Sequence, residues 1–363
     1  MKKVVFVINS LQNGGAERVV VTQANFLARQ GKYKPIIICL RKWNQYAIDK
    51  GVDIIYLSKR ETFSPIRKIS GIFKMRNMID RELEKIGLEN ICLLTVHLPL
   101  PHIICRFSKY MNKFLFVMHN PHFQFKYSRT ILFKKIIKIL YFKNKLVCVS
   151  NGIKKELVEY YDMNPNNLFV IYNPLDFDRI DKQLKSKPSK KDYDRYILFC
   201  GRLTDQKRPD RAVRAFYDSD LYKDYNMVMI GIGEKEDETY EQIKGLGMAD
   251  KIHLLGWKDD IYAWMKGASA LICSSDYESF GMVLVEALYC GCPVVSTNCK
   301  YGPDEILVGK LSKYLTKLNA HDLGNMTKKA LRSYPNIDYA IFDKFKVEKI
   351  VNEYINLYGK ELI

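Results

Sequence analysis

Two glutamates occur in a stretch of the chain whose composition otherwise favours burial. Residues 278–295, ESFGMVLVEALYCGCPVV, are almost wholly apolar, yet they contain Glu278 and Glu286. A buried carboxylate is costly unless hydrogen bonds or a cation compensate it. The two carboxylates therefore need polar partners, which are either other groups of the protein, as in a capped or salt-bridged structural glutamate, or the hydroxyl groups of a ligand.

The same stretch predicts a helix that begins next to the first glutamate. Residues 282–290 contain no Gly or Pro and are apolar on nearly every side, which is typical of a buried helix. The N–H groups at its start have no partner within the helix and add a partial positive charge near Glu278. These N–H groups belong to Gly281, Met282 and Val283.

Two cations stand five residues apart in a second segment, CGRLTDQKRPDRAVRAF. Arg202 and Lys207 follow the apolar run 196–201, which reads as a strand, and they precede a predicted helix. Fixed positive groups at the end of a strand stabilise the charge that develops on a diphosphate leaving group. The alternative is a pair of solvated loop cations.

A pair of glycines follows the first apolar run, in NSLQNGGAERVV. Gly14 and Gly15 precede a helix predicted to begin near Ala16, so that backbone N–H groups can approach an anion there. The pattern is not G-x-G-x-x-G and does not support a nicotinamide dinucleotide site.

The elements that must position these residues are short apolar runs separated by helical patterns. Runs of β-branched and aromatic residues without alternation suit parallel strands covered on both faces. The chain therefore predicts an α/β fold of two tandem Rossmann-like, doubly wound domains, whose ligands bind beyond the carboxyl ends of the strands and in the cleft between the domains. The predicted strands are 3–9, 35–40, 53–57, 91–95, 114–118, 146–150 and 168–172, then 196–201, 226–231, 251–256, 270–275 and 292–297.

The domain boundary falls in a polar, Lys-rich segment. Residues 176–195 show no apolar period and are predicted to be a linker between an N-terminal domain, 1–175, and a C-terminal domain, 196–342. The last segment, 343–363, predicts a helix with one apolar face, and we expect it to return to the N-terminal domain.

Several of these segments together resemble glycosyltransferase family 4. The segments are GRLTDQK, ESFGMVLVEALYCGCPVVST, GPDEIL, VSNGIKKEL, YNPLD, the diglycine loop and His119 after the run FLFVM. The resemblance covers most of the chain, and Glu278 and Glu286 match the E-x7-E signature of that family. It implies a retaining glycosyltransferase of the GT-B fold that uses a nucleotide-sugar donor.

The resemblance also implies roles for individual residues. Arg202 and Lys207 would hold the donor diphosphate, Glu286 the ribose, and Glu278 the hydroxyl groups of the transferred sugar, which would give the buried carboxylates their partners. His119 would line the reaction centre, with Arg202, Lys207 and Glu278 as the other catalytic residues. The remaining donor-binding groups would be Gly14 and Gly15 near the phosphates, the backbone near Leu255 at the base, and Phe280, Gly281, Met282 and Val283.

Two features depart from the family pattern or leave an alternative open. After GPDEIL the family often continues with a Gly-rich segment, whereas this chain has VGKLSKYLT. His122 and His97 are alternatives to His119 for the same role.

The expected mechanism and cofactor requirement follow from the same resemblance. Family members are described as front-face enzymes in which the leaving phosphate accepts the proton of the acceptor. The sequence shows no D-x-D element at a strand end, so we expect no metal, with the cations and the helix start near Gly281 replacing it. A UDP-sugar is the expected donor, and no other cofactor is expected.

The charge of the chain is its compositional outlier. The formal net charge is +18, and residues 90–155 contain no Asp or Glu but twelve Lys and Arg residues. Within them, residues 128–146 predict a basic amphipathic helix with Lys134, Lys135, Lys138 and Lys145 as its basic residues and Leu132, Ile136, Ile139 and Leu140 on the opposite face.

A helix of this kind can lie in an anionic membrane surface. That position would suit a lipid-linked glycan acceptor of capsule, O-antigen or lipopolysaccharide assembly. The alternatives are a packed helix with a solvated lysine face, and a polyanion- or nucleic-acid-binding protein without transferase activity. No nucleic-acid motif is present, so nucleic acid is not an expected partner.

The expected location is the cytoplasm, peripheral to the inner face of the cell membrane. No apolar run reaches the length of a membrane span, and no signal peptide precedes the first strand. The nine cysteines lie mostly singly in apolar runs, as buried thiols do in a reducing compartment.

Overall fold

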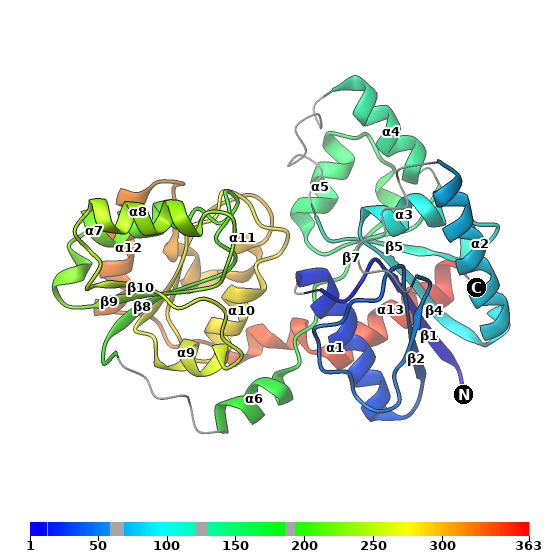
Figure 1. The fold of residues 1–363 in the computed structure, drawn as a ribbon, viewed down its shortest axis with the longest axis horizontal. Coiled ribbons are helices and arrows are strands. Elements are labelled where there is room, and N and C mark those ends of the chain that lie inside the picture. Colours follow the sequence, from blue (N-terminus) through cyan, green and yellow to red (C-terminus); the bar gives the residue numbers. More distant parts are fainter. Residues whose placement is uncertain (13, 59–68, 121–129, 142, 186–192, 363) are drawn as a thin grey trace. The chain divides into compact units, whose positions relative to one another are not determined.

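The structure is a computed structural model that describes residues 1–12, 14–58, 69–120, 130–141, 143–185 and 193–362. It divides into two compact units (Figure 1). The N-terminal unit is Met1–Asp176 with Lys344–Ile363, and the C-terminal unit is Phe177–Asp343. Within the described residues, no helix is long and apolar enough to cross a membrane.

The N-terminal unit is built on a parallel sheet of seven strands in the order β3-β2-β1-β4-β5-β6-β7. Its central strands are buried throughout, as their unbroken apolar sequences predicted. The strands are β1 (Lys3–Ile8), β2 (Lys34–Cys39), β3 (Asp53–Tyr56), β4 (Ile91–His97), β5 (Leu115–Met118), β6 (Leu146–Cys148) and β7 (Leu168–Val170).

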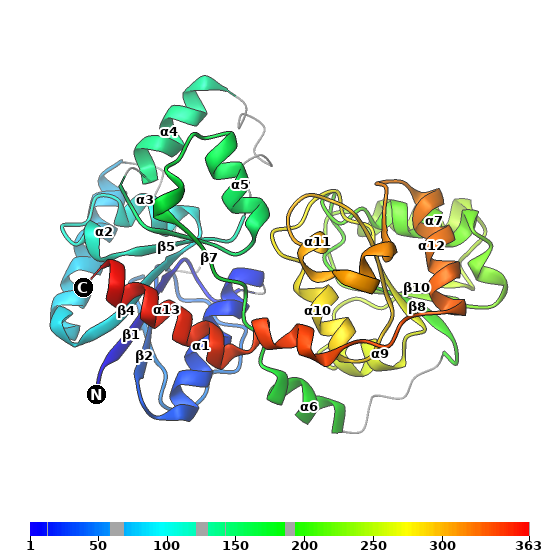
Figure 2. The ribbon, with the colours of Figure 1, turned by 180° about the vertical axis from the view of Figure 1, so that it is seen from behind.

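The last helix of the chain packs on this first unit. Figure 2 shows it beside α1 and across the strands at the centre of the sheet, and it contacts both α1 and β4. Its buried face consists of Val347, Ile350, Val351, Tyr354 and Tyr358. The helices of the unit are α1 (Gly15–Gln30), α2 (Ile69–Ile86), α3 (Pro99–Cys105), α4 (Ile131–Tyr141), α5 (Asn151–Glu159) and α13 (Val347–Glu361).

The C-terminal unit repeats the architecture with a parallel sheet of six strands in the order β10-β9-β8-β11-β12-β13. Its strands are β8 (Tyr196–Cys200), β9 (Asn226–Ile230), β10 (Ile252–Leu254), β11 (Ala270–Cys273), β12 (Val294–Thr297) and β13 (Leu315–Thr316). Its helices are α6 (Phe177–Lys185), α7 (Pro209–Asp218), α8 (Glu236–Gly245), α9 (Ile261–Gly267), α10 (Met282–Tyr289), α11 (Pro303–Ile306) and α12 (Ala320–Arg332).

Each sheet has one point at which the strand order reverses. In the first sheet it lies between β1 and β4, and in the second between β8 and β11. Ligands of doubly wound sheets bind beyond the carboxyl ends of the strands at this reversal. In the first sheet, Gly14 follows β1 and His97 is the last residue of β4. In the second sheet, Arg202 follows β8 and Glu278 follows β11. The predicted fold class of two doubly wound α/β units is confirmed.

The segment predicted to be a linker differs from the prediction. Its first half forms α6, which packs on α9 in the C-terminal unit and accepts a hydrogen bond from Tyr289 through Asp181. The prediction of a segment without an apolar period was wrong, because Phe177, Ile180 and Leu184 recur at helical spacing and Ile180 is buried. Residues 186–192 of the predicted linker lie outside the described residues.

The predicted basic helix is also shorter than expected. Helix α4 ends at Tyr141, and Lys145 lies just before β6, where it pairs with Glu361 of α13 at 2.6 Å. Lys145 therefore does not continue the stripe of Lys134 and Lys138. The prediction was wrong because the apolar residues of 144–149 belong to the sheet, which ends the helical pattern.

Candidate functional site

The carboxylate of Glu278 and the ammonium of Lys207 form an ion pair at the reversal point of the second sheet. Lys207 Nζ lies 2.5 Å from Glu278 Oε1. The hydroxyl of Ser275 donates to the same oxygen at 2.7 Å, and the thiol of Cys273 lies 3.9 Å from it. Glu278 thus has partners within the protein, which is the first of the two alternatives that its sequence surroundings left open, whereas the family resemblance had implied sugar hydroxyls.

This pair is held by hydrogen bonds between the two loops that carry it. The hydroxyl of Ser274 donates to the backbone carbonyls of Lys207 and Arg208, both at 2.8 Å. The amide of Gln206 donates to the carbonyl of Tyr277 at 3.0 Å, and the carbonyl of Gln206 accepts from the backbone N–H of Asp276 at 2.9 Å. The loops after β8 and β11 are therefore one rigid support for Lys207 and Glu278.

Lys207 keeps its charge in this environment. Burial acts to lower the pKa of the ammonium, but the Glu278 carboxylate outweighs burial, and the pKa lies above its ordinary value. An ammonium of this kind can move from a carboxylate to an equally close anionic ligand without a change of protonation.

Arg202 lies at the same place but is not engaged by a carboxylate. Its side chain is exposed, and among the described residues it forms no ion pair. Arg202 acts electrostatically on Tyr277, as does Lys207: burial raises the pKa of that phenol, and the two cations oppose the increase. The structure thus brings Arg202 and Lys207 to the same loop pair, as their spacing suggested.

Helix α10 begins beside Glu278, where the sequence predicted a helix start. Gly281 caps it with φ of 92°, a left-handed conformation that side chains disfavour, and the helix continues from Met282. Met282 and Val283 are half-buried at its first turn, while Phe280 is buried in the core. The partial positive charge of the first turn therefore lies close to the Lys207–Glu278 pair.

Glu286 lies one turn further along α10 and is buried. The hydroxyl of Tyr262, on α9, donates to Glu286 Oε1 at 3.2 Å. A protein group therefore satisfies part of this carboxylate as well. No local pattern in the sequence pointed to Tyr262, because it is twenty-four residues away and the contact exists only once α9 packs on α10.

Leu255 follows β10, and its backbone N–H is already used. It donates to the carbonyl of Met229 at 3.0 Å. The carbonyl of the next residue, Gly256, is also used, because it accepts from the backbone N–H of Gly231 at 2.9 Å. A base bound there would have to meet a backbone group other than the Leu255 N–H.

The diglycine loop of the N-terminal unit begins α1, as predicted. The hydroxyl of Tyr46 bridges the loop, because it accepts from the Gly14 N–H at 3.1 Å and donates to the Gly14 carbonyl at 2.8 Å. A methyl group added to Gly14 would overlap the carboxylate of Glu17, whereas Gly15 has open space. The Glu17 carboxylate therefore lies over this helix start and would have to move before a phosphate could approach it.

His119 follows β5 and forms a hydrogen bond with a second buried histidine. Its Nε2 lies 2.8 Å from Nδ1 of His97, and Nε2 of His97 lies 2.9 Å from the hydroxyl of Thr95. Burial lowers the pKa of His119 to about 3, with a smaller contribution from His102. Burial, followed by His119, holds the pKa of His97 well below its ordinary value.

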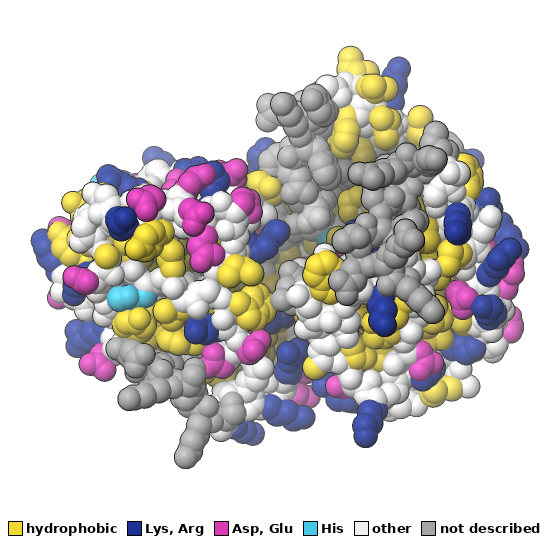
Figure 3. Space-filling model, in the orientation of Figure 1, with side chains coloured by type: hydrophobic (Ala, Val, Ile, Leu, Met, Phe, Trp, Pro, Cys, Tyr) yellow, Lys and Arg dark blue, Asp and Glu magenta, His cyan; other side chains and the backbone are white. Residues whose placement is uncertain are grey.

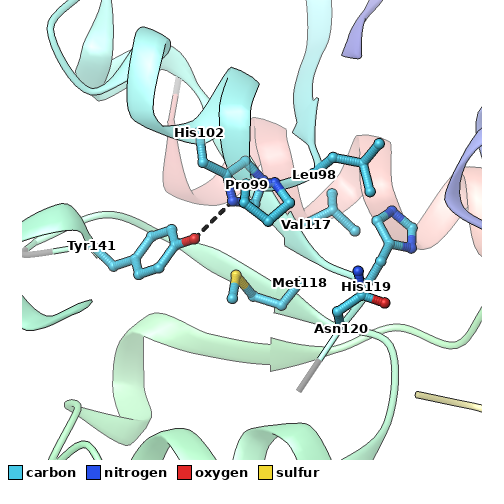
Figure 4. Close-up of a pocket in the computed structure, with 8 residues that line it drawn as sticks. All are labelled: Leu98, Pro99, His102, Val117, Met118, His119, Asn120 and Tyr141. Atoms are coloured by element: carbon cyan, nitrogen blue, oxygen red, sulfur yellow. Dashed lines mark hydrogen bonds between the residues drawn. The ribbon is translucent and has the colours of Figure 1, made fainter. Parts of the chain in front are cut away.

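A small hollow of about 10 Å³ lies beside His119, which is room for about one water molecule. Figure 4 shows His119 and Asn120 after Met118, and on the other side of Met118 the hydrogen bond between His102 and Tyr141, which measures 2.8 Å. His122, the other alternative to His119, lies outside the described residues.

The basic half of the chain is less cationic in the structure than its sequence suggests. Lys134 and Lys138 both pair with Asp162, at 2.8 and 3.2 Å. Lys135 is exposed and forms no ion pair with the described part of the chain. Helix α4 instead exposes apolar side chains, which gather at the top of Figure 3. They are Ile131, Leu132, Ile136 and Ile139, with exposed fractions of 77%, 69%, 49% and 66%.

Two family models match adjacent parts of the chain. The model described as Glycosyltransferase Family 4 matches residues 13–179, and the model described as Glycosyl transferases group 1 matches residues 180–339. The Glu278, Glu286, Arg202 and Lys207 positions all lie in the second match.

Two proteins of Campylobacter jejuni are among the similar sequences. One is N-acetylgalactosamine-N,N'-diacetylbacillosaminyl-diphospho-undecaprenol 4-alpha-N-acetylgalactosaminyltransferase, 28% identical over 313 residues that cover 84% of this chain and 83% of the relative. The other is GalNAc-alpha-(1->4)-GalNAc-alpha-(1->3)-diNAcBac-PP-undecaprenol alpha-1,4-N-acetyl-D-galactosaminyltransferase, 25% identical over 85% of this chain and 82% of the relative.

The solved structures agree with the fold. The chain resembles Alr3699/HepE of Anabaena, solved in complex with UDP and glucose, with a TM-score of 0.76 over 99% of this chain and 100% of that one, at 15% identity. This likeness confirms the GT-B fold. The basic charge had left two classes of protein open, a transferase and a polyanion-binding protein without transferase activity. The two family models favour the transferase. The chain belongs to the glycosyltransferases, since the Glycosyltransferase Family 4 model matches its N-terminal part and the Glycosyl transferases group 1 model matches its C-terminal part.

Proposed function

We propose that this enzyme transfers a hexose or N-acetylhexosamine from a UDP-sugar, with retention of configuration, to a lipid-linked or cell-envelope glycan acceptor. The acceptor class is that of capsule, O-antigen or lipopolysaccharide assembly, at the cytoplasmic face of the membrane. The observation that carries the proposal is the charged Lys207 held at 2.5 Å from Glu278, beside the first turn of α10.

In the proposed mechanism, the donor replaces each partner of this pair. The diphosphate takes Lys207 and the exposed Arg202, and the hydroxyl groups of the sugar take the Glu278 carboxylate that Lys207 releases. Fixed cations and the start of α10 then stabilise the charge on the leaving phosphate, which accepts the proton of the acceptor. Because these groups supply the positive charge, we propose that no metal is required.

The nature of the donor and acceptor is supported by the relatives. Alr3699/HepE was solved with UDP and glucose, and both Campylobacter relatives are named as N-acetylgalactosaminyltransferases that act on diphospho- or PP-undecaprenol glycans. A donor with a uracil base and an acceptor with a lipid anchor are therefore the first to be tested.

The lipid-linked acceptor requires a way to meet the membrane, and α4 offers one. Its exposed apolar side chains cover an arc of the helix that also contains Lys135, whereas Lys134 and Lys138 lie at the edge of that arc and are paired with Asp162. We therefore propose that the apolar face of α4 inserts into the bilayer interface and that Lys135 adds a preference for anionic lipids.

The donor proposal is tested by thermal shift and donor hydrolysis with a panel of nucleotide sugars. We expect one UDP-sugar to stabilise the protein and to be hydrolysed, and both effects to be lost in Lys207→Met and Glu286→Gln. The matched controls are Lys244→Met and Glu241→Gln, an exposed pair on α8 in the same unit, which should behave as the wild type. A folded protein that no nucleotide sugar stabilises would contradict the proposal. Magnesium and EDTA are compared in the same assay, and a requirement for the metal would overturn that part of the mechanism.

The membrane proposal is tested by flotation with vesicles. We expect the wild type to bind vesicles of phosphatidylglycerol and phosphatidylcholine, and Leu132→Ser with Ile139→Ser to abolish binding. The control is Leu318→Ser with Ile232→Ser, two apolar residues of the C-terminal unit that are also exposed, at 44% and 54%. Lys135→Gln should reduce the preference for phosphatidylglycerol over pure phosphatidylcholine. Equal vesicle binding by the wild type and the α4 double variant would contradict the proposal.

A further inference from the structure

Three buried polar groups at the end of β4 form a chain that ends on His119. The hydroxyl of Thr95 bonds Nε2 of His97, and Nδ1 of His97 bonds Nε2 of His119. Thr95, His97 and His119 are all buried, with exposed fractions of 1%, 0% and 7%. Each link needs one donor and one acceptor, so the direction of the whole chain is set by any one of its members.

Both histidines are neutral, which leaves two directions for the chain. Burial holds the pKa of each ring far below neutrality, so each carries a single proton. In the first direction Thr95 donates to His97, and the Nδ1–H of His97 donates to Nε2 of His119. In the second direction His119 donates through Nε2–H to His97, and His97 donates through Nε2–H to Thr95.

Thr95 decides between these two directions. In the second direction its own hydroxyl proton would need another acceptor, yet among the described residues the Thr95 hydroxyl has no partner other than His97. A buried hydroxyl proton without an acceptor is costly. The first direction satisfies the Thr95 hydroxyl and leaves only an N–H of His119, the ring that lines the small hollow, for another partner. The hydroxyl of Thr95 therefore donates to His97.

The first direction determines which nitrogen of His119 carries the proton. Because its Nε2 accepts from His97, the proton lies on Nδ1, and Nδ1 has no hydrogen-bond partner among the described residues. The ring therefore offers a ligand an N–H donor rather than a lone pair.

We propose that Thr95 and His97 are positioning residues that fix His119 in the Nδ1–H tautomer, so that His119 acts in the transfer reaction as a hydrogen-bond donor and not as a general base. The role in the reaction rests on the proposed function, but the tautomer does not. A donor at this place would bind an oxygen of the sugar or acceptor and would leave the acceptor proton to the departing phosphate.

The tautomer is measured directly by long-range ¹H–¹⁵N correlation on the full-length protein with ¹⁵N-labelled histidine, which distinguishes the protonated nitrogen of each neutral ring. We expect Nδ1–H for His119 and for His97. His102 is an internal reference of the opposite kind, because its Nε2 lies 2.9 Å from the carbonyl of Val96 and must donate. An Nε2–H tautomer or an imidazolium at His119 at neutral pH would overturn the proposal.

Variants separate positioning from a merely structural role. Thr95→Val removes the donor with little change of shape, and we expect His119 to populate the Nε2–H tautomer, whereas Thr95→Ser should restore the wild-type spectrum. Asn at position 97 can place an N–H where His97 Nδ1 lies, and Leu cannot. We therefore expect His97→Leu to lower kcat at least about tenfold at an unchanged donor KM, and His97→Asn to recover most of it.

The outcomes distinguish this proposal from the proposed function. A wild-type spectrum retained in Thr95→Val, or an equal kcat in His97→Leu and His97→Asn, overturns the positioning role. If no nucleotide sugar is turned over, the proposed function fails, and the spectra of the wild type and of Thr95→Val still decide whether the chain of hydrogen bonds sets the tautomer.

Discussion

At the scale of single residues, the site is an arrangement of charges that already satisfy one another. Glu278 is held by Lys207, Ser275 and Cys273, and Glu286 receives a hydrogen bond from Tyr262. A donor must therefore exchange partners with the protein and not simply fill empty positions. An exchange of this kind conserves the number of charge-assisted hydrogen bonds, so binding energy is not lost to exposing an unpaired charge.

The first prediction concerns the cost of breaking this pair. Lys207→Met and Glu278→Gln should each lower the free energy of unfolding by about 3 kcal/mol, because each removes one partner of a largely buried pair. The double variant should cost clearly less than the sum, since no unpaired charge is left. Urea unfolding of the four proteins measures the coupling. The exposed Lys244–Glu241 pair should give a coupling of about 0.3–0.5 kcal/mol in the same cycle, and additive costs at the buried pair would contradict the prediction.

The second prediction concerns acid stability and follows from His97. Its pKa is depressed in the folded protein, so below the unfolded value of about 6.5 the unfolded chain binds a proton that the folded chain does not. Stability is therefore lost as the pH falls through this range, by about 1.4 kcal/mol per pH unit for each such group. His97→Asn should make the decrease shallower by about that amount between about pH 6 and 4. Urea unfolding at each pH tests this prediction, with hydrogen exchange of β4 as the probe of the N-terminal unit. Parallel profiles of stability against pH for the wild type and His97→Asn would refute it.

At the scale of elements, the parallel strands were predictable and the edges of helices were not. Each strand predicted from an unbroken apolar run has a counterpart, because a strand buried on both faces has no polar positions to obscure it. The short β13 was missed, since two residues give no pattern. Helix α6 was missed because only Phe177, Ile180 and Leu184 are apolar, and Lys145 was assigned to α4 because periodicity alone does not show where a helix gives way to a strand.

The candidate site was predictable in its charged members and in the helix start at Gly281, but not in its hydroxyl groups. Glu278 and Glu286 stand out in the sequence because charge is unexpected in apolar surroundings, and Arg202 and Lys207 stand out because they follow a predicted strand directly. Ser275, Tyr262 and Thr95 do not stand out, because hydroxyl side chains occur in loops, helices and strands alike. Their roles depend on contacts between elements that are far apart in the chain, and only the fold shows those contacts.

The third prediction concerns the start of α10. Gly281→Ala should cost about 1–2 kcal/mol of stability, because the residue has φ of 92° and its new Cβ would lie 3.2 Å from Leu284 Cδ1. Displacing this first turn should also weaken the thermal shift produced by the donor. Gly245→Ala is the control: it lies in α8 with no atom within 4 Å of its new Cβ, so it should be neutral or stabilise by up to about 1 kcal/mol. Equal effects at the two glycines would argue against a special backbone requirement at Gly281.

At the scale of the whole molecule, the charge of the N-terminal unit is set by residues that are distant in sequence. The segment 90–155 has no acidic residue, yet its lysines pair with Glu84, Asp162 and Glu361. A count along the sequence therefore overestimates the free positive charge that a membrane meets. Much of what remains for the bilayer on α4 is apolar surface, so vesicle binding should depend less on salt than the formal net charge of +18 suggests.

The last prediction concerns the C-terminal helix as part of the N-terminal unit. Ile350, Val351, Tyr354 and Tyr358 of α13 are buried against that unit, and the hydroxyl of Tyr358 donates to the carbonyl of Lys113 at 2.9 Å. Burial of each large side chain is worth roughly 1.5–3 kcal/mol, so that four of them together rival the whole stability of a domain.

A chain that ends at Asp343 should therefore lose the fold of its N-terminal unit and keep that of its C-terminal unit. Hydrogen exchange measured by mass spectrometry should show β1 and β4 exchanging fast, with β8 and β11 protected as in the full chain. Tyr358→Phe is the mild control, because it removes one hydrogen bond worth about 1 kcal/mol and keeps the buried ring. Protection of β1 and β4 in the shortened chain would show that the sheet is stable without α13, and the helix would then be an addition to the unit and not a part of its core.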